Sequence, residues 1–98
     1  MLESKFQAEV IKDIKKILPG CIVIKNDANY IQGFPDLTIL FGSNWAVLEV
    51  KRSDKESYQP NQEYYLDQLN GMSYAAMICP QNRELIFDEL QLALRSGR

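Results

Sequence analysis

The sequence predicts a small α/β domain in which a mixed β-sheet is flanked by helices, in the order α-β-β-β-α-β-α. Segments with a helical apolar repeat open and close the chain, and short apolar runs rich in strand-forming residues lie between them. Gly and Pro stand at several of the junctions between these segments. With 98 residues, 46% of them apolar and 24% charged, the chain is expected to form one domain over residues 1–98.

The first half of the chain predicts a helix, a strand and a loop. Apolar side chains within residues 3–18 fall on one helical face, and Pro19 and Gly20 end that helix. Residues 21–24 form a β-branched run, which predicts a buried strand. Residues 26–33 are polar and rich in turn formers, so we expect a loop there.

The middle of the chain predicts a β-hairpin. Residues 36–41 and 45–51 are strand-like, and residues 42–44 form the turn between them. The charged residues 52–59 that follow are expected to form a loop.

Two helices and one strand are predicted in the last part of the chain. Pro60 suits the first turn of a helix running to about residue 70, with Gly71 as its stop. Residues 74–79 then predict a strand, and residues 83–95 a final helix.

Composition excludes several kinds of chemistry. The chain has no histidine, so it can use neither a Ser-His-Asp or Cys-His nucleophile system nor a His-liganded zinc site. Its two cysteines, Cys21 and Cys79, lie in apolar runs and predict reduced core thiols in an intracellular protein. No apolar stretch approaches the ~20 residues of a membrane span, and no signal-peptide pattern is seen.

Three charged residues of the hairpin are the candidate catalytic group. Asp36 and Glu49 are equidistant from the turn, because (36 + 49)/2 = 42.5, and residues so placed lie opposite each other. Glu49 and Lys51 are two apart on one strand and therefore share a face. Two carboxylates and an ammonium group should meet on one patch of the sheet.

Two readings of this patch stay open. Lys51 could balance the two carboxylates in an ordinary cross-strand ion-pair cluster. Alternatively, a metal ion lies between them, since Glu49 stands between Leu48 and Val50 in an apolar strand, where an unpaired carboxylate is costly. Two carboxylates with water and a backbone carbonyl suit Mg²⁺.

The order of motifs resembles that of the VRR-NUC nucleases, a branch of the PD-(D/E)xK (restriction-endonuclease-like) superfamily. The elements of the resemblance are a helical Glu, a G-x-PD turn, an E-x-K strand and a Gln that opens the next helix. Here they are Glu9, Gly33-Phe34-Pro35-Asp36, Glu49-Val50-Lys51 and Gln62. The resemblance covers residues 5 to 79 and is to the small stand-alone members of phage type.

The resemblance implies a role for each residue. Asp36 and Glu49 would bind Mg²⁺, or Mn²⁺ in its place, with the Val50 carbonyl as a further ligand. Glu9 would complete the acidic cluster, for which Asp13 is the less favoured alternative. The remaining two would act at the reacting centre: Lys51 would orient or deprotonate the attacking water, and Gln62 would face the same site.

The implied function is metal-assisted hydrolysis of phosphodiester bonds in branched DNA, such as a four-way (Holliday) junction, by a homodimer. The implied location is intracellular, which is the cytoplasm of a bacterial host if a phage encodes the chain. A formal charge of −2 argues against strong binding to plain duplex and favours either recognition of shape or binding through two subunits. A relaxed flap or single-strand nuclease and a catalytically silent nucleic-acid-binding module are the alternatives. The candidate dimer surfaces are Trp45, the first helix, and the apolar arc of Leu85, Ile86, Leu90 and Leu94.

Overall fold

The computed structural model describes residues 2–96 and has the predicted element order. Its helices and strands are α1 (Glu3–Ile17), β1 (Ile22–Lys25), β2 (Leu37–Phe41), β3 (Asn44–Val50), α2 (Gln62–Met72), β4 (Tyr74–Ile78) and α3 (Arg83–Ser96). None of the helices in this part of the chain is long and apolar enough to cross a membrane.

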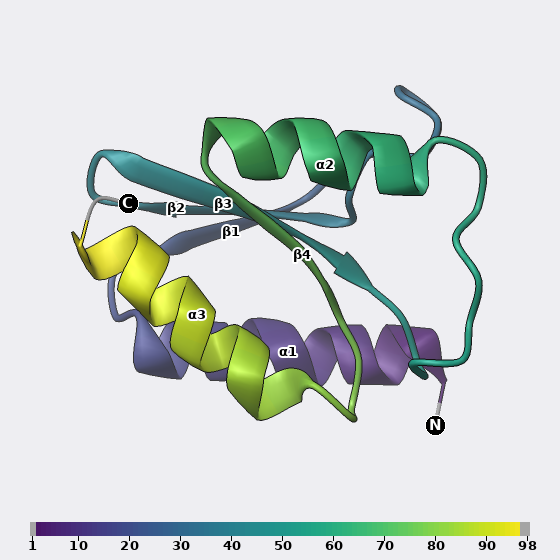
Figure 1. The fold of residues 1–98 in the computed structure, drawn as a ribbon. Coiled ribbons are helices and arrows are strands. Elements are labelled where there is room, and N and C mark those ends of the chain that lie inside the picture. Colours follow the sequence, from purple (N-terminus) through teal and green to yellow (C-terminus); the bar gives the residue numbers. More distant parts are fainter. Residues whose placement is uncertain (1, 97–98) are drawn as a thin grey trace.

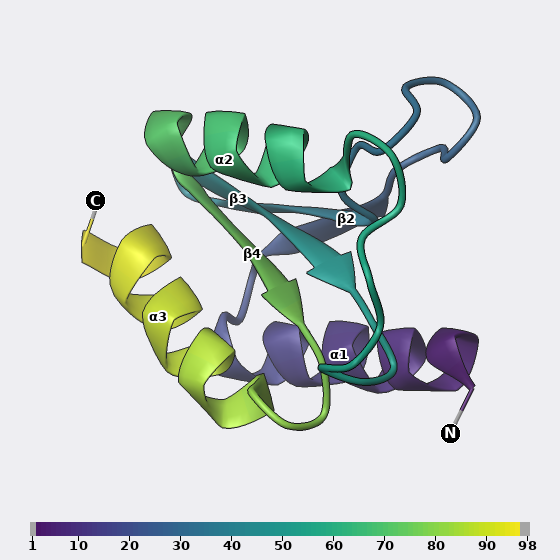
Figure 2. The same cartoon turned by 45° about the vertical axis from the view of Figure 1, so that its right-hand side comes forward.

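The four strands form one mixed sheet in the order β1-β2-β3-β4. β1, β2 and β3 pair antiparallel, whereas β4 pairs parallel to β3 through the α2 crossover. α2 lies on one face of the sheet, and α1 and α3 lie on the other (Figures 1 and 2). The fold is therefore three layers, with the central sheet between helices.

The main core lies between the sheet and the α1–α3 layer. Phe6, Val10 and Ile14 of α1 are fully buried, as their helical spacing predicts, and pack in one cluster with Leu90 of α3. A smaller apolar cluster under α2 contains Val47, Leu66 and Ala75. The face under α2 has less apolar packing, and it is on this face that the polar residues of the hairpin gather.

The prediction of a buried strand at residues 21–24 is right about the strand and wrong about its burial. β1 is an edge strand, and its Ile22 and Ile24 side chains are 59% and 43% exposed. Their β-branched shape favours an extended backbone, but burial depends on what covers the strand, and α2 packs on β3 and β4. Val23, on the opposite face, packs against the main core.

The prediction that Gly71 ends the second helix is also wrong. α2 begins at Gln62, after Asn61 with a left-handed φ of 72°, and runs through Gly71 to Met72. A side chain at Gly71 would meet nothing within 4 Å, so this glycine lies in an open stretch of the last turn.

Candidate active site

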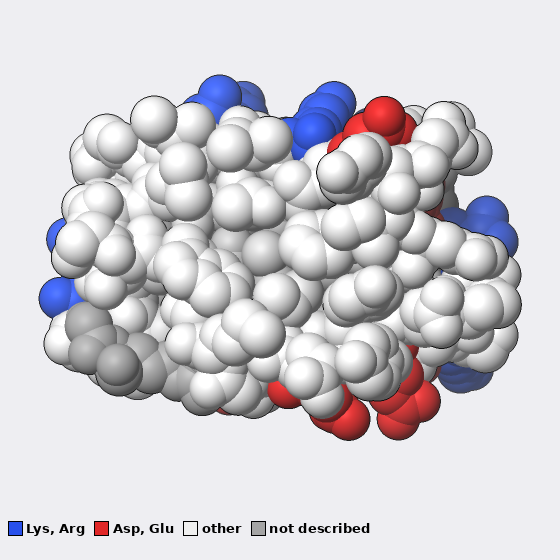
Figure 3. All heavy atoms as spheres, turned by 90° about the horizontal axis from the view of Figure 1, so that it is seen from above, with Lys and Arg blue, Asp and Glu red and all other residues white. Residues whose placement is uncertain are grey.

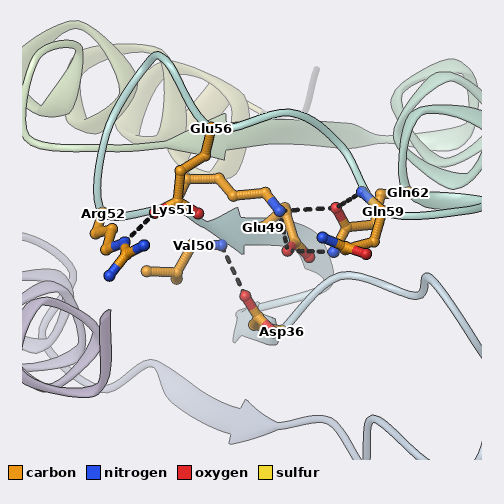
Figure 4. Close-up of polar contacts among 8 residues, drawn as sticks. All are labelled: Asp36, Glu49, Val50, Lys51, Arg52, Glu56, Gln59 and Gln62. Atoms are coloured by element: carbon orange, nitrogen blue, oxygen red, sulfur yellow. Dashed lines mark hydrogen bonds and ion pairs between the residues drawn. The ribbon is translucent and has the colours of Figure 1, made fainter. Parts of the chain in front are cut away.

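The candidate site lies at the carboxyl end of β3, on the face of the sheet that α2 covers. The hairpin register pairs Leu37 with Leu48, which places Asp36 and Glu49 next in line. This is the alignment that the turn-midpoint argument predicts. Figure 4 shows the two carboxylates beside each other, with Lys51 and Gln62 around Glu49.

Asp36 is held by hydrogen bonds from the ends of both neighbouring strands, β1 and β3. Its backbone carbonyl accepts the N–H of Asn26 at 2.8 Å, and the Asn26 side chain donates to the Pro35 carbonyl at 2.8 Å. Its Oδ2 accepts the backbone N–H of Val50 at 2.8 Å. The carboxylate is thereby aimed at the end of β3, with little freedom to turn away.

Glu49 is a buried carboxyl group with one unused oxygen. Its side chain is 4% exposed, and Oε2 accepts a hydrogen bond from Gln62 Nε2 at 2.8 Å and lies 3.8 Å from Lys51 Nζ. Oε1 is buried and accepts no hydrogen bond among the described residues, although a protonated Glu49 would share a hydrogen bond with the neighbouring Asp36 carboxylate. In the ionised state a buried oxygen without a partner is costly, and a cation bound there would remove that cost.

Gln62 connects the lysine to the glutamate. Its Oε1 accepts hydrogen bonds from Lys51 Nζ at 2.8 Å and from the Gln59 backbone N–H at 2.7 Å (Figure 4). Because both partners are donors only, the amide orientation is determined, and Nε2 must face Glu49. The resemblance expected Gln62 to face the site, and the structure brings it there.

Burial and proximity change the protonation of the acidic pair. Burial, together with the negative charge of Asp36, raises the pKa of Glu49 to about 8. Burial also raises the pKa of Asp36, against the opposing effects of the Val50 N–H and the Lys51 charge. Without a cation, the pair therefore keeps a proton at neutral pH, and a divalent cation would displace it.

The donor set fits a hard divalent cation held by few protein ligands. Within residues 2–96 no group of three or more acidic or thiol side chains is arranged to hold a metal ion. The two carboxylates and the unpartnered Glu49 Oε1 nevertheless suit Mg²⁺, which usually keeps several waters and binds one or two carboxylates. That the Val50 carbonyl adds a further ligand stays a prediction.

The structure places Glu9 away from this group, contrary to the sequence expectation. Arg83 of α3 pairs with Glu9, Nη1 to Oε1 at 3.4 Å, and with Asp13 through its Nη2. Both candidates for the helical carboxylate are thus used in joining α1 to α3. Glu3 is the α1 carboxylate that interacts electrostatically with Asp36 and Glu49.

Glu3 was missed although the sequence contains a signal for it. It stands three residues before Phe6 and seven before Val10, so it lies on the same helical face as the buried stripe, at the exposed amino end of α1. Partial burial and the negative charge of Asp36 raise its pKa. Glu9 falls at the edge of the stripe, where a side chain reaches the neighbouring helix instead of the end of the sheet.

Gly33 permits a close approach between the two loops that carry Asp36 and Gln62. Its φ is +86°, and a Cβ there would lie 2.6 Å from the Pro60 carbonyl oxygen and 2.7 Å from Asn61 Cβ. A side chain at this position would push the start of α2 away from β3. The sharp turn before Asp36 thus positions Gln62 as well.

Gly33→Ala is expected to lower any catalytic activity of this site by about tenfold or more. A displacement of Gln62 by even about 1 Å would break the hydrogen bonds that position Lys51 and Glu49. Gly20→Ala is the matched control, since Gly20 has a φ of +91° but nothing within 4 Å of the added Cβ. Both variants should lose about 1–2 kcal/mol of unfolding free energy from the left-handed backbone. An equal loss of activity in the two variants would contradict the positioning role.

Comparisons with solved structures match this architecture. A chain described as a VRR_NUC domain superposes with a TM-score of 0.71 and 17% identity, covering 88% of this chain and 94% of its own. The chain has the VRR-NUC fold. A second VRR_NUC domain protein gives a TM-score of 0.70 at 15% identity, covering 97% of this chain and 89% of the other.

A more distant structural match is Archaeoglobus fulgidus Hjc, a Holliday junction resolvase from an archaeal hyperthermophile. Its TM-score is 0.53 at 15% identity, over 79% of this chain and 68% of Hjc. No family model matches the sequence, and no curated protein matches it significantly. At these identities the likeness establishes the fold, and it confirms the fold implied by the sequence resemblance.

Proposed function

We propose that this VRR-NUC-fold chain is a Mg²⁺-dependent endonuclease that hydrolyses phosphodiester bonds in branched DNA and acts as a homodimer. The observation that carries the proposal is the carboxylate pair of partly buried Asp36 and buried Glu49, with an unpartnered Glu49 oxygen and the Lys51 ammonium group beside it. Support for branched DNA comes from the fold shared with Hjc, which is a Holliday junction resolvase.

Each residue of the site would have a separate role in hydrolysis. Asp36 and Glu49 would hold Mg²⁺, which supplies Lewis acidity toward the phosphate and makes water more acidic. Lys51 places a positive charge where negative charge develops on the phosphoryl oxygens in the transition state. Gln62 fixes the ammonium group at its 2.8 Å hydrogen bond and keeps Glu49 Oε2 engaged, so that Oε1 is the free oxygen. In this proposal Glu3 replaces Glu9 as the helical carboxylate, and it acts through its charge and not as a third ligand, since no three carboxylates within residues 2–96 are arranged to hold a metal ion.

A cleavage assay with labelled duplex, flap and four-way-junction DNA tests the proposal. The metal-stripped protein should be inactive but folded, since the apolar core needs no structural metal. Mg²⁺ or Mn²⁺ should restore cutting, and the junction should be cut in two opposed strands. Cleavage restored by Zn²⁺ but by neither of these ions would show that the site is wrong, and no cleavage with any metal would favour a silent binding module.

Most of the predicted candidates for a dimer surface are buried within one chain. Ile86, Leu90 and Leu94 of α3 are buried in the core, and the apolar face of α1 packs on the sheet. Trp45 is partly buried and packs against the smaller cluster under α2. Apart from the exposed Leu85, these residues are therefore buried or partly buried by contacts within one chain.

The uncovered face at the β1 edge is the better candidate for the dimer. Ile22 is paired in register with Leu40 of β2, and these two side chains, with Ile24, are exposed on one face. β1 also ends the sheet and so presents unpaired backbone groups along its outer side. A two-fold pairing of these edges would bury both features and bring two sites to one junction.

Ile24→Lys is therefore expected to convert a dimer into a monomer in sedimentation velocity, because a charge would have to be buried in the interface. The control is Leu92→Lys, at a leucine that is 68% exposed on α3, which should leave the dimer intact. A wild-type protein that is monomeric at micromolar concentration, both free and bound to a junction, would remove the paired-incision assignment and leave the nuclease chemistry standing.

A further inference from the structure

The loop between β1 and β2 carries an aromatic side chain that the proposed chemistry does not use. Tyr30 is 84% exposed, and the loop projects on the α2 side of the sheet, close to the end where α2 begins (Figure 2). We infer that this loop binds one unpaired nucleobase of the DNA substrate, with Tyr30 stacking on its face. The inference deepens the proposed nuclease function and depends on it for the identity of the substrate.

The loop is internally ordered, so that Tyr30 is presented on a fixed support. Asp27 Oδ1 accepts the Asn29 backbone N–H at 2.8 Å, and the Asp27 carbonyl accepts the N–H of Tyr30 at 3.2 Å. Farther along, Phe34 N–H donates to the Ile31 carbonyl at 3.2 Å. A base that binds a preformed loop loses less free energy to ordering than one that must organise it.

A hollow of about 490 Å³ lies on this loop, within the size range of small-molecule sites. One aromatic residue of its lining is held in place, because the Phe34 ring packs edge-on against Tyr65 of α2 with a centroid distance of 5.7 Å. The residues that line the hollow are Asn26, Asp27, Tyr30, Ile31 and Phe34.

The charge of the hollow favours a base over a phosphate. Its lining contains no lysine or arginine, and the Asp27 carboxylate would repel a phosphate. The same carboxylate can accept a hydrogen bond from an amino group or ring N–H of a base. The face over α2 is mostly uncharged, with Lys, Arg, Asp and Glu at its margins (Figure 3), so it has no basic patch that would track a phosphate backbone.

The position of the loop links the hollow to the candidate active site. The Asn26 backbone N–H donates to the Asp36 carbonyl, so the residue that lines the hollow is hydrogen-bonded to the residue that would hold the cation. A base in the hollow would therefore be held by the loop that leads into Asp36. Branched DNA provides unpaired or easily unpaired bases at its branch point, whereas plain duplex does not.

The test uses binding of DNA that carries the fluorescent base 2-aminopurine at one unpaired position, with fully paired duplex as the second probe. All proteins carry Glu49→Gln to prevent cleavage, and Tyr30→Ala is compared with Tyr30→Phe and, far away on α3, Leu92→Ala. Tyr30→Ala should weaken binding to the unpaired probe by about five- to a hundredfold and remove the fluorescence quenching caused by stacking. Tyr30→Phe and Leu92→Ala should retain both, and binding to duplex should be the same in all variants.

Two results would overturn the inference: equal binding of the unpaired probe by Tyr30→Ala, or an equal loss on duplex, which would make Tyr30 a general DNA contact. Failure of the nuclease proposal is recognised separately with the wild-type protein. Metal-dependent cleavage with no effect of Tyr30→Ala on binding refutes the base site alone. Tyr30-dependent binding without any cleavage refutes the nuclease and leaves the base site standing.

Discussion

Glu49→Gln and Asp36→Asn are each expected to lower DNA cleavage by about a thousandfold or more while leaving the protein folded. The loss of one ligand removes the Lewis acid from the site, and a cost of several kcal/mol in the barrier corresponds to a factor of this size. Both substitutions keep the shape of the side chain, so Gln at position 49 can still meet Gln62. Cleavage of a four-way junction at saturating Mg²⁺ measures the effect.

The same Glu49→Gln variant should be more stable than the wild type at high pH when no metal is present. The folded protein holds a proton on Glu49 up to about pH 8, whereas the unfolded chain releases it near the ordinary glutamate value of 4.5. The wild-type free energy of unfolding therefore falls as the pH rises from 4.5 to 8, by an amount of the order of a few kcal/mol. Glutamine cannot ionise, so the variant should lack most of this decline.

Chemical denaturation on either side of this pH range checks the stability effect, and Mg²⁺ should reverse the decline in the wild type alone. Glu63→Gln, at an exposed carboxylate next to Gln62 on α2, is the control and should change neither cleavage nor the pH dependence. Variants at Asp36 and Glu49 that unfold at ordinary temperature would instead identify the pair as a structural ion cluster.

Local sequence patterns predicted most of the fold because each element has its own signal. The period of the apolar residues in α1 and the turn-forming residues after Phe41 determine helix and hairpin without information from distant parts of the chain. The predicted turn at residues 42–44 is one residue too long, because Asn44 pairs with Phe41 and begins β3. The hairpin register then places Asp36 opposite Glu49. Burial of β1 could not be predicted in this way, since it depends on where α2 packs.

The sequence alone could not predict which carboxylate of α1 faces the site. Glu3, Glu9 and Asp13 are all on α1, and only the packing of α3 decides which of them is free, because Arg83 pairs with the latter two. The contact of Gly33 with Pro60 is likewise a meeting of two loops far apart in the sequence. Tertiary contacts of this kind leave no periodic pattern in one segment.

Lys51→Met is expected to lower cleavage by about a hundred- to a thousandfold while Mg²⁺ still binds. The ammonium group is not a metal ligand, and its charge is needed when negative charge develops on the phosphate. Methionine fills the buried space of the lysine stem, and Gln62 Oε1 still accepts the Gln59 N–H, so the amide should keep its orientation. The change should therefore act on the charge more than on the packing.

In this variant the loss of the Lys51 charge raises the pKa of Glu49 beyond the wild-type value of about 8. Magnesium affinity therefore has to be compared with the wild type at a pH well above 8, because protons compete with the cation at lower pH. Lys55→Met, at an exposed lysine in the following loop, is the control and should behave like the wild type. A large loss of Mg²⁺ binding by Lys51→Met at this pH would show that the lysine organises the carboxylates. Unchanged cleavage by the variant would show that the transition state makes no use of the lysine charge.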